Sequence, residues 1–217
     1  MESICKPVGS ITFPPFGNTR VMMMPIEIGE PLPPALDRWA AALQGLTALV
    51  PEHRGRVGYL TIDEKTVQVG ETHRRPGLHV DGVFRGQAGA WGGGGAPWAS
   101  QANGMLLVAS EPGCVAYNQR FEGEPGPEGQ CDHLRSECAR STRIMLRPEV
   151  AYWMNASCVH ESLPQRSPVR RQLIRLSLPS QAPWFEGYTE SPLGVRPTGP
   201  ILPRRDAFMD WDLQKSL

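Results

Sequence analysis

Residues 34–62 read PALDRWAAALQGLTALVPEHRGRVGYLTI, and the hydrophobic period changes within this stretch. In its first part, apolar side chains recur every three or four residues, which is typical of one face of a helix. Prolines stand at the start of that part and directly after Val50, so the sequence predicts a helix over 34–50. In the last part, 56–62, side chains alternate between two faces, which predicts a strand.

The chain beyond this stretch continues as short strand patterns separated by turns. Gly 23 and Pro 22 make up about a fifth of the 217 residues, which favours turns over long helices. Besides 56–62, the predicted strands are 20–28, 67–71, 78–84, 105–109, 114–117, 143–146, 150–154 and 172–178. Many short strands after one helix predict a mostly β fold, an antiparallel sandwich or barrel with a supporting N-terminal helix.

Length and composition indicate one domain. A chain of 217 residues that is 40% hydrophobic can bury a single substantial core. We predict one domain over 1–217, with a core at about 56–180, the helix at 34–50 and a C-terminal tail, 181–217, that wraps the surface.

The charge balance argues against a nucleic-acid partner, since Lys+Arg 22 equals Asp+Glu 22. Five cysteines are too few, and odd in number, for a disulfide scaffold. The first residues, MESICKP, lack the pattern of a secretory signal, and the apolar run 21–26 is too short to span a bilayer. We therefore expect a soluble, cytoplasmic protein that binds no membrane.

His79 and Asp81 stand two residues apart in RRPGLHVDG, residues 74–82. On a strand, two such side chains project from the same face. His160, in VHESLP at 159–164, could supply a third ligand from a distant strand. Two histidines and one carboxylate on one side of a metal suit Fe(II) and leave positions open for a cosubstrate and O2. The sequence therefore predicts His79, Asp81 and His160 as metal ligands.

The order of these residues resembles that of the Fe(II)/2-oxoglutarate-dependent dioxygenases, and most closely the branch of phytanoyl-CoA hydroxylase. The likeness spans about 78–177 and rests on the His-x-Asp pair, the distal His160 and an arginine eleven residues later, Arg171. It implies a double-stranded β-helix (jelly roll) and the cofactors Fe(II) and 2-oxoglutarate. It also implies that a small molecule is hydroxylated or desaturated while succinate and CO2 are released.

The resemblance further implies a site for the cosubstrate. Arg171 matches the arginine that binds the distal carboxylate of 2-oxoglutarate, and Ser162 matches a residue that helps to hold it. Arg175, in Arg-Leu-Ser at 175–177, resembles the corresponding arginine of the penicillin-synthase-like branch, so both arginines stay open as the anchor, with Arg171 favoured. A planar guanidinium suits this task because it can grip a carboxylate at two points.

Three residues are candidates for contact with substrate: Arg75, Trp91 and Trp98. Trp91 lies in the glycine-rich segment 86–96, with Trp98 just beyond, and we interpret this segment as a lid, with a plain surface loop as the alternative. The basic run 73–75 could guide an anionic substrate or could simply be exposed. The predicted partners are O2 and a small molecule, for which a carboxylate would suit the spare arginines.

Other interpretations remain open from the sequence. The chain could be a cupin-like metal enzyme that does not use 2-oxoglutarate, or a β-barrel binding module without enzymatic activity. Cys131, His133 and Cys138 could bind zinc, but their spacing fits no standard motif and ordinary thiols are favoured. His53 and His73 have no evident partner and are expected to be solvated.

Overall fold

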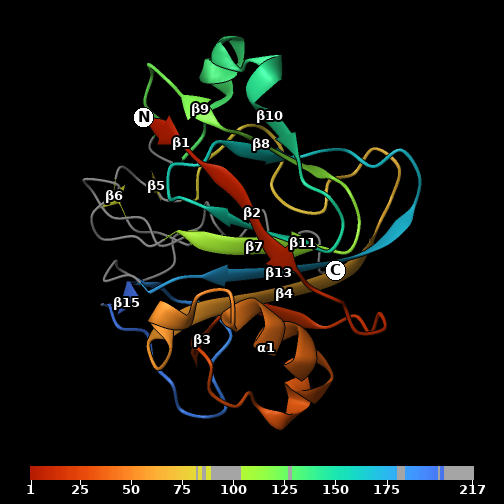
Figure 1. The fold of residues 1–217 in the computed structure, drawn as a ribbon, viewed down its shortest axis with the longest axis vertical. Coiled ribbons are helices and arrows are strands. Elements are labelled where there is room, and N and C mark those ends of the chain that lie inside the picture. Colours follow the sequence, from red (N-terminus) through yellow and green to blue (C-terminus); the bar gives the residue numbers. More distant parts are fainter. Residues whose placement is uncertain are drawn as a thin grey trace.

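The computed structural model describes residues 1–81, 83–84, 87–88, 104–126, 129–179, 184–199 and 201–202. The chain is mostly β and its sheets are mainly antiparallel, which confirms the predicted fold class at this level (Figure 1). Across these residues, no helix combines the length and the apolar character that crossing a membrane requires.

A six-stranded sheet forms the middle of the molecule, in the order β2-β11-β7-β13-β4-β3 (Figure 1). Its strands are β2 (Cys5–Ser10), β3 (Arg20–Glu27), β4 (Val57–Val67), β7 (Met105–Ala109), β11 (Val150–Met154) and β13 (Val169–Ser177). β13 is hydrogen-bonded to β4 along its whole length and to β7 over its second half. The strand that carries Arg171 and Arg175 is therefore held on both sides.

A smaller sheet faces the large one. In it, β8 (Cys114–Tyr117) lies between β10 (Arg143–Met145) and β12 (His160–Ser162). The segment 78–80 adds to the edge of β12, because His79 and His160 exchange two backbone hydrogen bonds of 3.0 Å. Apolar side chains of both sheets share one buried cluster, including Leu107 and Leu173 of the large sheet and Cys114 and Ala116 of the small one. The two sheets thus pack face to face.

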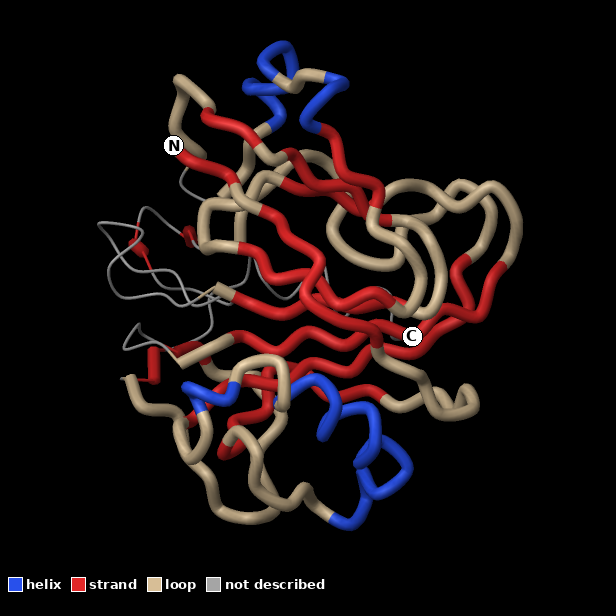
Figure 2. The backbone as a smooth tube through the Cα atoms, in the orientation of Figure 1, coloured by secondary structure: helices blue, strands red, loops and turns tan. Residues whose placement is uncertain are grey.

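The N-terminal helix covers the opposite face of the large sheet (Figure 2). It begins as the 3₁₀ helix η1 (Pro34–Trp39) and continues as α1 (Ala40–Thr47), within the predicted range 34–50. The alternation of β4 divides its side chains between the two faces. Leu60 and Ile62 pack beneath the helix, whereas Thr61 and Asp63 point toward the small sheet.

Several short elements complete the described chain. They are β1 (Glu2–Ser3), η2 (Pro51–His53), β5 (Val83–Phe84), β6 (Gln87–Ala88), β9 (Gln119–Arg120), η3 (Asp132–Glu137), η4 (Arg140–Thr142), β14 (Trp184–Phe185) and β15 (Ile201–Leu202). Within the predicted tail, Thr189 and Thr198 are hydrogen-bonded to Met22 of β3 and Tyr59 of β4. This part of the tail therefore lies along the large sheet.

Two strand predictions differ from the structure, and one strand was not predicted. The separate strand 67–71 is wrong: β4 runs to Val67, and the chain then turns at Gly70, whose φ of 78° is one that glycine adopts without strain. In place of the predicted strand 78–84, the structure has isolated β-bridges at His79 and the two-residue strand β5. The sequence missed β2, because Pro7 and Gly9 weaken its strand pattern; β2 lies at the sheet edge, where proline is tolerated.

Candidate metal centre

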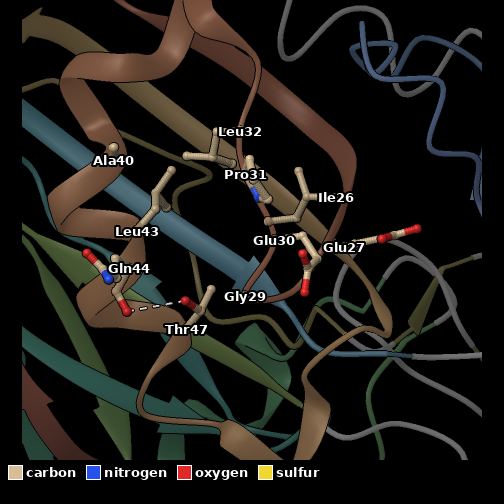
Figure 3. A pocket seen from close by; sticks show the side chains of 10 residues that line it. All are labelled: Ile26, Glu27, Gly29, Glu30, Pro31, Leu32, Ala40, Leu43, Gln44 and Thr47. Atoms are coloured by element: carbon tan, nitrogen blue, oxygen red, sulfur yellow. Dashed lines mark hydrogen bonds between the residues drawn. The ribbon is translucent and has the colours of Figure 1, made fainter.

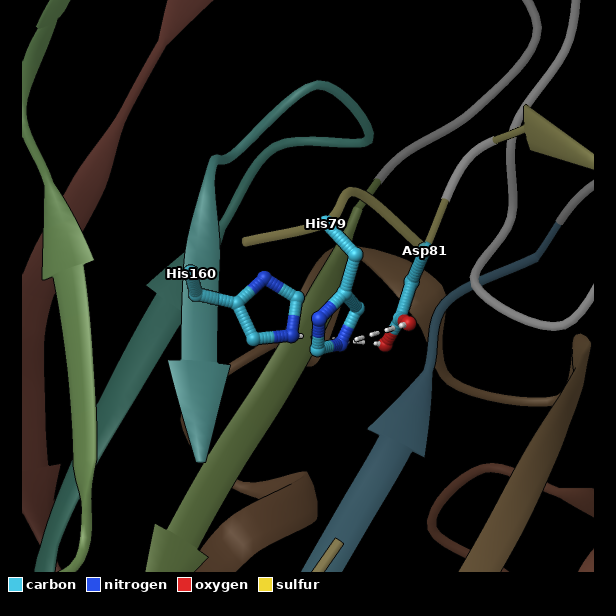
Figure 4. Close-up of side chains that lie close together, drawn as sticks. All are labelled: His79, Asp81 and His160. Carbon is cyan, nitrogen blue, oxygen red and sulfur yellow. Dashed lines mark ion pairs between the residues drawn. The ribbon is translucent and has the colours of Figure 1, made fainter. Parts of the chain in front are cut away.

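His79, Asp81 and His160 converge between the two sheets (Figure 4). Nε2 of His79 lies 3.9 Å from Oδ1 of Asp81, and Nε2 of His160 lies 3.8 Å from Oδ2. One ligand atom from each side chain lies within 4.8 Å of the other two, and in the part of the chain that the structure describes this is the one such group. Bonds of about 2.1 Å to one metal would place these atoms about 3 Å apart, so small side-chain movements suffice.

Backbone carbonyls orient both imidazoles. Nδ1 of His79 lies 2.8 Å from the carbonyl oxygen of Gly77, and Nδ1 of His160 lies 2.9 Å from that of Cys158. Because a carbonyl can only accept, each Nδ1 carries the proton and donates it. In the neutral form of each ring, Nε2 presents its lone pair toward Asp81, which is the tautomer and orientation that a metal ligand needs.

The charges of the group also suit a cation. Burial, with a further contribution from His160, lowers the pKa of His79 to about 3, so this ring is neutral near pH 7. Burial alone would raise the pKa of Asp81, but the Arg175 guanidinium and the two imidazoles outweigh it and hold that pKa well below its ordinary value. Nη1 of Arg175 donates to Oδ2 of Asp81 at 2.7 Å. A neutral imidazole and an ionised carboxylate are the forms that bind metal.

An outer clamp of Asp132, Arg135 and Glu161 ties the two histidine-bearing segments together. Oδ1 of Asp132 accepts hydrogen bonds from the backbone N–H of Leu78 at 3.1 Å and from Arg135 at 2.7 Å. Arg135 also donates to both carboxylate oxygens of Glu161, at 2.9 and 3.2 Å. Since Leu78 and Glu161 adjoin His79 and His160, the clamp supports the spacing of the two ligands. None of these three residues was predicted from the sequence.

A second polar group, the arginine cluster, lies at the other end of β13 and consists of Arg171, His73, Asp63 and Arg74. Nε of Arg171 donates to the carbonyl of Glu111 at 3.0 Å, and Nη1 donates to Nδ1 of His73 at 2.7 Å. Nε2 of His73 lies 3.4 Å from Oδ2 of Asp63, which also accepts from Arg74 at 2.9 Å. Arg171, His73 and Asp63 are each 1% exposed.

His73 and His53 were expected to be solvated, and that expectation is wrong for both. His73 lies inside the arginine cluster, while His53 is buried with its Nδ1 3.3 Å from Nη1 of Arg56. The sequence offered only an indirect signal for His73, because the charged Asp63 directly follows one predicted strand and Arg171 directly precedes another. Buried charges of this kind need polar partners.

Ser162 is buried on β12 and shares the inward face with His160, two residues earlier. It pairs with Cys114, next to Gly113. A Cβ at Gly113 would lie 3.5 Å from Nε of Arg171, so the end of β12 reaches the arginine cluster. The structure therefore brings Ser162 and Arg171 to the same part of the interior.

The remaining candidates from the sequence are less closely linked to this site. Arg75 is half-buried and its charge contributes to the low pKa of His79, whereas Trp91 and Trp98 lie outside the described residues. Cys131, His133 and Cys138 are not among the described groups that could hold a metal. Instead, Nε2 of His133 is 2.9 Å from the carbonyl of Glu124, and burial raises the pKa of Cys131 to about 12, which disfavours a thiolate ligand.

A separate pocket lies on the helix side of the large sheet, between α1 and β3 (Figure 3). It is lined by Ile26, Glu27, Gly29, Glu30, Pro31, Leu32, Ala40, Leu43, Gln44 and Thr47. The metal group faces the other side of the same sheet, so this pocket has no part in its chemistry.

Comparison of the chain with protein-family models, with curated proteins and with solved structures gave no match. The geometry of the site is therefore the basis for a functional proposal.

Proposed function

We propose that this protein is an Fe(II)- and 2-oxoglutarate-dependent oxygenase that hydroxylates or desaturates a small molecule, with release of succinate and CO2. One observation carries the proposal. Two histidines and an aspartate with converging ligand atoms face the same interior as the buried Arg171, which has no ion pair among the described residues. A buried cation without a counter-charge is costly, and an anionic ligand would relieve that cost.

We further infer that the fold is a double-stranded β-helix. The chain alternates between the sheets as it proceeds: β4 is in the large sheet, 78–80 in the small, β7 in the large, β8 and β10 in the small, β11 in the large, β12 in the small and β13 in the large. A jelly roll likewise has eight strands in two facing sheets. On this interpretation β2 and β3 extend the large sheet at its two edges.

The donor set fits iron. Two neutral imidazoles and one carboxylate on one side of a metal form the face that non-haem Fe(II) oxygenases use, with the remaining positions open. Bound iron would supply the activation of O2. The protein contributes the orientation of the ligands through the Gly77 and Cys158 carbonyls, and it contributes exclusion of water through burial of the site between two sheets.

The arginine cluster fits the distal end of a diacid. The charges of Arg171 and Asp81 both act on the thiol of Cys114, which supports a shared space between metal group and cluster. Arg171 is the better anchor, because Arg175 already donates to Asp81. Arg175 then acts on the metal group by keeping Asp81 ionised. Ser162, at the end of β12, is suited to bind the same carboxylate as Arg171.

The test is anaerobic loading of the purified protein with Fe(II), followed by addition of 2-oxoglutarate and then O2. We expect one iron per chain and succinate release that requires iron, 2-oxoglutarate and O2 together. His133→Ala, which alters an exposed histidine, is the matched control for His160→Ala, which should remove iron binding. Iron binding without consumption of 2-oxoglutarate would favour a cupin-like enzyme, and absence of stoichiometric metal would favour a binding barrel; either result would refute the proposal.

A further inference from the structure

Among the described residues, the side chain of His73 is the one that accepts a hydrogen bond from Arg171, at its ring nitrogen Nδ1. A guanidinium keeps all its protons in proteins, so it can only donate, and Nδ1 of His73 must present a lone pair. Burial lowers the pKa of His73 to about 4, even though Asp63 opposes this shift, so the ring is neutral near pH 7. Its single proton therefore lies on Nε2.

Asp63 accounts for the orientation of that ring. Nε2 of His73 lies 3.4 Å from Oδ2 of Asp63, and the proximity of His73 together with the charge of Arg74 outweighs burial and holds the pKa of Asp63 far below its ordinary value. Asp63 forms its direct ion pair with Arg74, at 2.9 Å, and not with Arg171. His73 thus touches Arg171 with a neutral acceptor and leaves its positive charge intact.

A free arginine side chain loses about 2 kcal/mol of rotamer entropy when it is fixed. In this protein the Glu111 carbonyl and His73 fix the guanidinium from two sides before any ligand arrives. A preorganised group binds its ligand more tightly because the ordering cost does not fall on the binding step.

We propose that His73 is a positioning residue for the cosubstrate site: held by Asp63, it fixes Arg171 in the orientation that grips the distal carboxylate, and so sets the preference for a diacid. This inference rests on the proposed function and names a determinant of cosubstrate selectivity. His73 itself does not touch the cosubstrate.

The test compares two 2-oxo acids of equal chain length by calorimetry on the anaerobic Fe(II)-loaded protein. These are 2-oxoglutarate and 2-oxopentanoate, which has a methyl group in place of the distal carboxylate. Loss of one hydrogen bond to the charged Arg171 should weaken 2-oxoglutarate binding about tenfold in His73→Leu and leave 2-oxopentanoate binding unchanged. His73→Asn, whose Oδ1 can replace Nδ1 as acceptor, should recover most of the affinity.

His53→Leu is the matched control, because His53 is also buried with Nδ1 facing an arginine, but on η2. It should leave both affinities unchanged. Equal weakening of both acids in His73→Leu would indicate a purely structural role and overturn the inference, as would unchanged binding of both. If the wild-type protein binds no 2-oxoglutarate, the proposed function itself fails, which is a distinct result.

A second measurement needs no substitution and decides the case in which His73→Leu does not fold. Nitrogen-15 NMR of the metal-free protein near pH 7 reports which ring nitrogen carries the proton. We expect Nε2–H for His73 and Nδ1–H for His79 and His160. A proton on Nδ1 of His73 would rule out its bond from Arg171 and overturn the inference.

Discussion

The two faces of the large sheet are built from the same strands and differ in the side chains that they bury. Toward the helix, β4 and β13 present Leu60, Ile62, Ile174 and Leu176, all buried in one apolar cluster. Toward the small sheet, the alternating positions of β13 carry Arg171 and Arg175 on either side of the aliphatic Leu173. Burial of apolar side chains stabilises a fold, whereas buried charges are costly unless they serve a ligand or a partner. Under the proposed function, the apolar cluster on the helix side serves stability, and the buried arginines of the other face serve binding.

The largest effect is expected from Asp81→Ala on the inner face. It removes one of three ligand side chains, so iron binding and succinate formation should fall by more than the 10–100-fold typical of residues that only support a ligand. Metal content and succinate release provide the measurement. Asp37→Ala, an exposed acidic residue of η1, should leave both unchanged. Full turnover by Asp81→Ala would show that the inner face does not provide the metal site.

Leu46→Ala tests whether the helix side of the large sheet affects stability without affecting the metal site. Leu46 of α1 is fully buried in the cluster between the helix and the large sheet, and its truncation should lower the free energy of unfolding by about 2–5 kcal/mol. The fraction that remains folded should keep its affinity for iron. Urea unfolding gives the stability, with the exposed Gln44→Ala as a control expected to change it by less than about 0.5 kcal/mol. Loss of iron affinity in folded Leu46→Ala would show that the two faces are coupled.

Arg135→Ala tests the outer clamp. Without Arg135, the link between Asp132 and Glu161 is lost, and the segments that carry His79 and His160 are held together less firmly. We expect about 10–100-fold weaker iron binding, as for other residues that support ligands. Titration with Fe(II) measures this, and Arg140→Ala, in the separate helix η4, is the control. Unchanged affinity would show that the backbone pairing of His79 with His160 suffices.

A pH dependence of stability is expected from the buried histidines of the inner face. His73 and His79 have folded-state pKa values of about 4 and about 3, below the value of about 6.5 in an unfolded chain. The unfolded state therefore takes up more protons below pH 6.5, and the stabilisation present above that pH is lost as pH falls toward 4. Each histidine should contribute up to about 1.4 kcal/mol per pH unit. Urea unfolding of the metal-free protein at pH 7, 6 and 5 measures the slope; equal stability at these values would contradict the neutral burial of both rings.

Local pattern was enough to predict part of this molecule. The apolar stripe of 34–50 and the alternation of 56–62 predicted the helix and the start of β4, because both depend on side chains close in sequence. His79 and Asp81 were predicted as neighbours for the same reason. The convergence of His160 with them, which the structure contains, was predicted from the order of residues rather than from their periodicity.

The parts that escaped prediction depend on contacts between distant segments. Nothing near His73 indicates that β4 and β13 will enclose it, so it resembled one more polar residue of a basic run. Arg135 lies in a short 3₁₀ helix without a hydrophobic period, and its partner Glu161 is 26 residues away. Strand 67–71 failed because the sequence pattern continues through Gly70, whereas the chain turns there.

The double pairing of β13 has a consequence for selectivity. β13 is hydrogen-bonded to β4 along its whole length and to β7 from Leu173 onward, so the backbone fixes the interval between Arg175 at the metal group and Arg171 at the far end. That interval of four residues corresponds to about 13 Å of strand. It would limit the length of a ligand that extends from the metal group to Arg171. Under the proposed function, substitutions elsewhere in the interior would then change which substrate is oxidised, while the cosubstrate would remain an acid of the same length.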